Sequence, residues 1–290
     1  MFRTLISLMV LVALAGSARA DEFGDLWYDG KAELDGYRLE VSRYGEPRQG
    51  TAVMIFVTEP FSQTERVKAD KPGPTTFNAF KLNLVRDFQT GIYDYNTMVS
   101  VFTHDSDFAL SKVSFSSAEW CGHMYQDLIV HPDRVDGRRF SYFAGESGDY
   151  SLEHPKDGIQ EDQLFVLVRS LRNEFLASGE TRTFPFLPGP YVERLQHKEP
   201  GWTDIEITRR KNTQSLSVPA GSFQVRVYDL KVGDGREGTF YVEDAYPHRI
   251  VRWELPPDQM GELTGSIREP YWSLNHNGHE SYLKELGLDD

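Results

Sequence analysis

The sequence predicts a mainly β protein with an antiparallel sheet and one substantial helix. Three observations support this fold class. Apolar and polar residues alternate with a period of two through most of the chain, aromatic residues make up 13% of it, and turn residues recur between the alternating stretches. A period of two is typical of a strand that has one face in the core.

Strands in the first half are predicted by this alternation. Residues 37–41 place Tyr, Leu and Val on one face and Arg and Glu on the other. Residues 51–59, TAVMIFVTE, are apolar on both faces, which indicates an interior strand. Further strands are expected over residues 79–88, 92–103, 112–127 and 138–144.

One segment has a helical period instead. Leu164, Val168, Leu171 and Phe175 recur at steps of four, three and four, which places them on a single helical stripe. We therefore expect one substantial helix over residues 161–178.

After this helix the pattern returns to short strands separated by turns. Asp234-Gly235 is suited to a tight hairpin because glycine tolerates positive φ. Strands are expected over residues 182–187, 203–209, 222–232, 238–243 and 249–255. The chain is thus expected to form a single β-rich domain over residues 21–290, or two halves, 21–157 and 180–290, that the helix joins.

The first 20 residues have the pattern of a signal peptide. Arg3 precedes an apolar run from Leu5 to Ala15, and Ala18-x-Ala20 fits the small-x-small pattern that signal peptidase cleaves. The apolar run is shorter than the roughly 20 residues of a membrane-spanning helix. We expect export to the periplasm or the exterior, cleavage after about Ala20, and no transmembrane segment in the mature chain.

The charge of the mature chain bears on its partners. Removing Arg3 and Arg19 lowers Lys plus Arg from 31 to 29 against 44 acidic residues, a formal net charge of −15. Such an acidic surface repels phosphate backbones, so nucleic-acid binding is not expected. The chain has one cysteine, so no internal disulfide forms. It has no nucleophile elbow, phosphate-binding loop or dinucleotide fingerprint, and no cofactor is expected.

Two groups of residues carry a resemblance to a known family. The first is a Pro-Ala-Gly-x-Phe turn entering a strand, followed by a hairpin and an aromatic-Pro-His-Arg segment: Pro219, Ala220, Gly221 and Phe223, then Tyr246, Pro247, His248 and Arg249. The second is a set of N-terminal segments, WYDGKAEL, GTAVMIFVTEPFS, KLNLVRDFQTGIYDYN and EWCGH.

With these segments, most of the mature chain resembles a group of exported bacterial proteins of unknown function. The resemblance implies a strongly curved antiparallel sheet or open barrel, broadly like periplasmic lipoprotein carriers that enclose an apolar cavity. The name Maf-type septum-formation inhibitor is sometimes attached to such sequences. Maf proteins have an early Ser-x-Arg-Arg-type motif and alternating strands and helices, and this chain has neither, so that assignment is not supported.

Cys121 and His123 form the first candidate catalytic pair. Residues i and i+2 of one strand point to the same face, so a thiol and an imidazole base can approach each other there. The competing interpretation is structural, because a free cysteine is commonly a buried small hydrophobe and Gly122 suits a bulge. The pair therefore supports a cysteine-dependent hydrolase as an alternative to a non-catalytic protein.

His276 and His279 are the candidate metal ligands. An H-x-x-H spacing places two imidazoles on one face of a helix, where they can bind zinc. Asn277-Gly278 between them is a turn signature, which favours a solvated turn.

Aromatic residues supply the candidate ligand cavity. These side chains can line a space for a lipid, a glycan or another envelope molecule, or they can pack as an ordinary core. The candidates are Trp27, Tyr93, Tyr95, Trp120, Tyr125 and Tyr142.

The expected function is that of an exported, non-catalytic β-protein of the bacterial envelope that binds an apolar or amphipathic molecule. The alternatives are the Cys121 hydrolase and a module that binds another envelope protein. The shape of the sheet distinguishes them, because a carrier needs an empty, apolar-lined interior.

Overall fold

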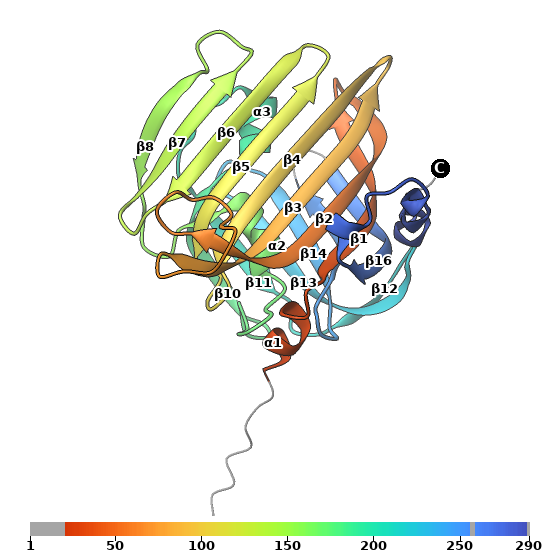
Figure 1. Cartoon of the computed structure of the whole chain (residues 1–290). Coiled ribbons are helices and arrows are strands. Elements are labelled where there is room, and N and C mark those ends of the chain that lie inside the picture. Colours follow the sequence, from red (N-terminus) through yellow and green to blue (C-terminus); the bar gives the residue numbers. More distant parts are fainter. Residues whose placement is uncertain (1–20, 256–258, 289–290) are drawn as a thin grey trace, which may run out of the picture.

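The computed structural model describes residues 21–255 and 259–288. The signal peptide expected over residues 1–20 lies outside this part of the chain. The described residues form sixteen strands in one sheet, which confirms the mainly β, mostly antiparallel fold (Figure 1). The sheet is mixed, because β9 and β10 pair in parallel.

The elements have the following bounds. The strands are β1 (Ala32–Arg43), β2 (Glu46–Ser62), β3 (Thr76–Thr90), β4 (Tyr93–His104), β5 (Leu110–Glu119), β6 (Gly122–Val130), β7 (Arg134–Ser141), β8 (Gly148–Glu153), β9 (Ile159–Gln160), β10 (Thr181–Leu187), β11 (Thr203–Arg209), β12 (Gln214–Val218), β13 (Gly221–Val232), β14 (Glu237–Glu243), β15 (Ile250–Leu255) and β16 (Gln259–Glu269). The helices are α1 (Glu22–Trp27), α2 (Leu164–Leu167) and α3 (Pro190–Gln196), with 3₁₀ turns η1 (Glu161–Gln163), η2 (Tyr271–Ser273) and η3 (His279–Leu286).

The strand order joins the two ends of the described chain. From β8 to β1 the strands follow one another as hairpins, and β1 then pairs with β16, which continues through β15, β14 and β13 to β11, β10 and β9. The sheet ends at β8 on one side and β9 on the other, so it is open and does not close into a barrel.

The helix expected over residues 161–178 is wrong in its extent. Only η1 and the four-residue α2 are helical there, and Ser170 has a φ of 52°, which interrupts a right-handed helix. The segment meets apolar neighbours on several sides, because Phe165 and Val166 are as buried as Leu164. The burial of these side chains therefore does not follow the one-sided stripe of an amphipathic helix.

This segment lies inside the molecule, between two parts of the sheet. The ring of Phe165 is 5.0 Å from Phe240 of β14 and 5.7 Å from Trp253 of β15. The guanidinium of Arg169, farther along the segment, lies 4.2 Å from the centre of the Phe56 ring of β2. Figure 1 shows β13 and β14 behind β2 to β5, with α2 among them. The interior between these strands is therefore packed with side chains.

Candidate functional site

Cys121 lies in a turn, because the single strand expected over residues 112–127 is two strands. Glu119 of β5 pairs with Gly122 of β6, which leaves Trp120 and Cys121 as the connection. Cys121 is exposed, so it does not pack as a buried hydrophobe. His123 begins the exposed face of β6. The thiol and the imidazole thus do not share a strand face.

An aromatic cluster surrounds this turn. The Tyr44 and Tyr95 hydroxyls are 2.8 Å apart, and the Tyr93 hydroxyl donates to Tyr44 at 3.2 Å. The ring of Tyr93 lies 6.4 Å from that of Trp120, which is 66% exposed. Burial and the bond to Tyr44 raise the pKa of Tyr95, so its hydroxyl stays protonated. Three of the candidate aromatic residues are brought together here.

Trp27 and Tyr125 lie outside this cluster, whereas Tyr142 packs beside the turn. Trp27 is buried at the end of α1, with its ring 4.8 Å from Phe80. Tyr125 is exposed on β6, and Tyr142 follows β7 with its ring over Gly122, where a Cβ atom would lie 2.3 Å away. The six residues therefore do not line one common space.

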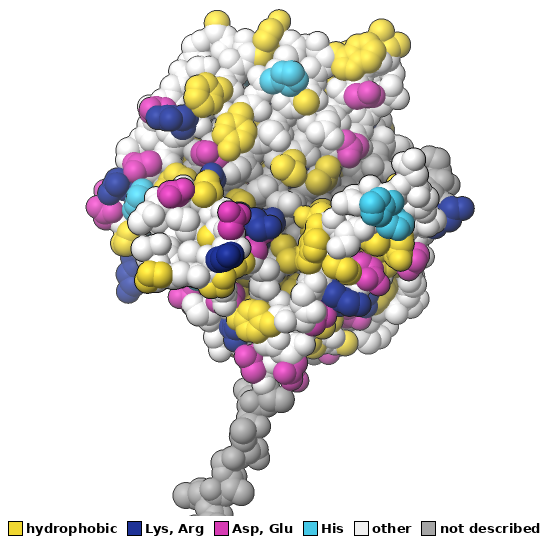
Figure 2. Space-filling model, viewed as in Figure 1, with side chains coloured by type: hydrophobic (Ala, Val, Ile, Leu, Met, Phe, Trp, Pro, Cys, Tyr) yellow, Lys and Arg dark blue, Asp and Glu magenta, His cyan; other side chains and the backbone are white. Residues whose placement is uncertain are grey.

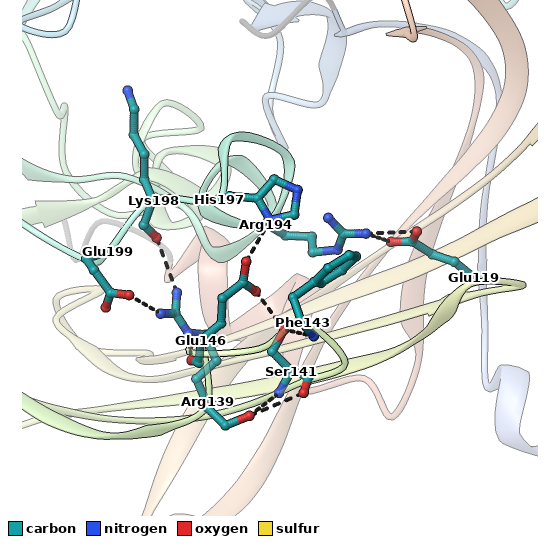
Figure 3. Close-up of polar contacts among 10 residues, drawn as sticks. Glu119, Arg139, Ser141, Phe143, Glu146, Arg194, His197, Lys198 and Glu199 are labelled. Atoms are coloured by element: carbon teal, nitrogen blue, oxygen red, sulfur yellow. Dashed lines mark hydrogen bonds and ion pairs between the residues drawn. The ribbon is translucent and has the colours of Figure 1, made fainter.

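A buried ion pair fastens α3 to the end of β5. Arg194 of α3 donates to both carboxylate oxygens of Glu119 at 2.7 and 2.9 Å, and both side chains are buried. Figure 3 shows the ring of Phe143 beside this pair, and the guanidinium lies 4.3 Å from its centre. Because breaking a buried pair leaves a charge without compensation, this contact holds α3 against the sheet.

A second set of contacts ties the loop after β7 to the end of α3 (Figure 3). Glu146 accepts from the Ser141 hydroxyl at 2.6 Å and lies 2.6 Å from His197 Nδ1. Arg139 donates to Glu199 at 2.9 Å and to the Lys198 carbonyl at 3.2 Å. These ion pairs and hydrogen bonds connect β7 and the loop after it to the residues that follow α3.

Buried acidic residues form a feature that the sequence patterns did not indicate. Arg169 lies 2.7 Å from Glu33, and both are completely enclosed. Burial, followed by the negative charge of Glu33, raises the pKa of Asp35 well above its usual value. Both residues share the inner face of β1 with Tyr37, Leu39 and Val41. Their burial depends on the segment that covers that face.

The outer face of β3 to β7 presents an apolar row that crosses the strands. The register places Val85, Met98, Ser116, Tyr125 and Phe140 opposite one another in succession. Met98, Tyr125 and Phe140 are 38%, 41% and 58% exposed, respectively. Figure 2, which views this side, shows hydrophobic side chains across the upper part of the molecule. Paired residues on one face are neighbours, so these side chains form a strip that is apolar except at Ser116.

A polar row runs beside the apolar row, two residues farther along each strand. It consists of Asn83, Ser100, Ser114, Asp127, Arg138 and Asp149. Asp127 accepts from Ser114 at 2.6 Å and from the Tyr125 hydroxyl at 2.8 Å. Arg138 and Asp149 make two parallel bonds of 2.8 and 3.0 Å. These bonds connect the side chains of the polar row to one another.

A groove of about 580 Å³ follows the polar row toward the edge strand β8. Asp127, Asp136, Arg138, Asp149 and Ser151 contribute its polar groups, and Ile129 is among its apolar walls. Its volume is within the roughly 300–1,000 Å³ of small-molecule sites. By contrast, an interior space beside Leu128 and Trp202 measures about 10 Å³, enough for one water molecule at most.

His276 and His279 lie in the chain that follows β16. Their ring centres are 5.6 Å apart, and both line a separate pocket of about 370 Å³. No group of three or more His, Cys, Asp or Glu side chains within residues 21–255 and 259–288 is arranged to hold a metal ion. In the same part of the chain, no helix has the length and apolar character needed to cross a bilayer.

Comparisons with known proteins give no match from which a function could be assigned. No family model, no curated protein and no solved structure matches this chain.

Proposed function

We propose that this chain is an exported, non-catalytic protein of the bacterial envelope that binds a glycan on the outer face of β3 to β8. The sheet, on this proposal, is strongly curved around the segment of residues 159–176 and displays its ligand outside. The observation that carries the proposal is the apolar row lying directly beside the polar row and its groove.

The chemistry of the two rows suits a sugar chain. A sugar ring has an apolar face of C–H groups, which packs on an aromatic ring, and a periphery of hydroxyl groups. Tyr125 and Phe140 offer the exposed rings, and Asp127 and Asp149 offer acceptors for hydroxyl donors. Arg138 supplies donors in the same groove. An amphipathic, hydroxyl-rich ligand can pack on the apolar row and form hydrogen bonds with the polar row at the same time.

The packed interior supports binding outside the sheet. The carrier-type cavity expected from the family resemblance needs an apolar-lined space, whereas residues 164–169 touch both β2 and β15. An acidic exterior also disfavours anionic lipid surfaces. A glycan that is neutral, or that carries few negative charges, needs no interior cavity and is not strongly repelled by the acidic surface.

The test is co-sedimentation of residues 21–290 with protease-treated peptidoglycan sacculi, together with titration of soluble oligosaccharides. Loss of a central aromatic anchor typically costs about 2 kcal/mol or more, roughly 30-fold in affinity. We expect Tyr125→Ala/Phe140→Ala to lose binding by at least this factor.

Trp272→Ala is the matched control, because Trp272 is a half-exposed aromatic residue outside both rows. Equal binding by the double variant and the wild type would refute the site. Binding only to sacculi that still carry protein would instead support the protein-interaction alternative.

A further inference from the structure

The C-terminal strap, residues 271–288, crosses the outer face of β1 and β16. Gly36 of β1 pairs with Gly265 of β16, and a Cβ atom on either would lie 2.2 or 2.1 Å from a strap carbonyl oxygen. Only glycine permits this approach. Thr264 also donates to the Leu286 carbonyl at 2.5 Å. The strap is therefore seated directly on the sheet at one end.

A pocket of about 370 Å³ opens between the strap and the sheet. Its apolar walls come from both sides: Leu34 and Ile267 from the strands, and Tyr271, Leu274, Leu283 and Leu286 from the strap. This volume is in the range of small-molecule sites, and such sites combine apolar walls with a few polar groups.

The polar groups of this pocket come from the turn that carries both strap histidines. The amide of His276 donates to His279 Nδ1 at 3.3 Å. In a neutral imidazole, an accepting Nδ1 leaves the proton on Nε2, so His279 offers a hydrogen-bond donor. The pocket wall thus includes a donor for an accepting group.

The carboxylate of Glu280 restricts which hydrogen-bond acceptor a ligand can place in this pocket. The carboxylate accepts from the Gly278 amide at 2.5 Å, and Glu280 lines the same pocket. This carboxylate repels an anionic head group from the same wall. A neutral carbonyl or ether oxygen meets no such repulsion.

We propose that the strap pocket binds a small neutral amphipathic molecule, with its apolar chain against Leu34, Ile267 and Leu283 and a neutral ester or amide carbonyl beside His279. This site lies on strands β1 and β16, separate from the glycan-binding rows on β3 to β8. It goes beyond the proposed glycan binding and does not depend on it.

The test uses the chain of residues 21–290 with methyl-labelled Leu and Ile, titrated with monodecanoylglycerol at pH 8. Decanoate is the anionic counterpart with the same chain length. We expect saturable shifts of the Leu34, Ile267 and Leu283 methyl signals with the ester and at least tenfold weaker binding of decanoate. Absence of saturable shifts, or equal affinity for both ligands, would overturn the proposal.

Three substitutions make the test specific. Leu283→Trp adds bulk to the pocket and is expected to abolish binding, while Val67→Trp, at a residue of nearly equal exposure (45% against 44%), leaves binding unchanged. His279→Phe is expected to weaken binding of the ester. It is expected not to change binding of an uncharged decyl compound that lacks a carbonyl group. Equal losses in Leu283→Trp and Val67→Trp, or equal effects of His279→Phe on both ligands, would contradict the assignment.

Discussion

Glu193 shows how a single buried side chain ties stability to pH. It lies on α3, is 3% exposed, and accepts a hydrogen bond from Gln126 at 3.0 Å. Burial raises its pKa from 4.5 to about 7, more than the bond from Gln126 and the charge of Arg139 lower it. The folded protein therefore holds this proton at pH values where the unfolded chain has lost it.

The sign of the effect follows from this difference. Between about pH 4.5 and 7 the folded state binds more protons than the unfolded state, so stability falls as pH rises, and above pH 7 the whole cost is present. We expect Glu193→Gln to match the wild type near pH 4 and to exceed it by about 3 kcal/mol at pH 8. Urea unfolding at several pH values measures this. Glu237→Gln, at an exposed position, is the control, and a pH-independent difference for Glu193→Gln would contradict the assignment.

Cys121 is the residue on which the enzymatic alternative depends. Because the thiol is exposed in the turn between β5 and β6, we expect iodoacetamide to label it in the native protein. Cys121→Ser is expected to leave glycan binding and stability unchanged, as checked by co-sedimentation and urea unfolding. A Cys121 that reacts only after denaturation would contradict the exposed turn.

At the scale of elements, the segment between β9 and β10 replaces the expected helix with a packed core. Apolar residues at steps of three and four are necessary for an amphipathic helix, but they do not distinguish it from a segment enclosed on every side. Here Phe165 and Val166 fall between the stripe positions and are also buried. The position of the segment between sheet layers decides its conformation.

Phe165→Ala tests the role of this segment. Removing this fully buried ring leaves a cavity against the inner face of β14 and β15, so we expect a loss of about 3–5 kcal/mol in the free energy of unfolding. Phe140→Ala, at a 58% exposed ring, is expected to change stability by less than about 0.5 kcal/mol. Equal stability of the two variants by urea unfolding would show that the interior is not packed as described.

At the scale of the whole molecule, one pairing unites strands from both ends of the chain. Ten residue pairs join β1 to β16, and the inner faces of both parts pack on residues 164–176. Each part alone would expose its inner apolar face and an unpaired strand edge. Residues 21–157 and residues 180–290 therefore both contribute side chains to one buried cluster.

We expect residues 21–157 and residues 180–290, each produced alone, to lack a cooperative thermal transition, while residues 21–290 unfold in a single one. Circular dichroism against temperature measures this, with binding of a hydrophobic dye as the check for exposed apolar surface. A fragment with its own cooperative transition would contradict the common core.

The sequence by itself determined the β character, most strand positions in residues 37–104 and the turns, because alternation and turn chemistry are local properties of the chain. Only the tertiary structure decided that β1 pairs with β16 and that Tyr125 and Phe140 face outward. On β6, Met124 and Leu128 are apolar on one face while Tyr125 and Ile129 are apolar on the other, so alternation cannot say which face is inside. The candidate sites depend on which strands become neighbours, and that choice is made by contacts between residues far apart in the chain.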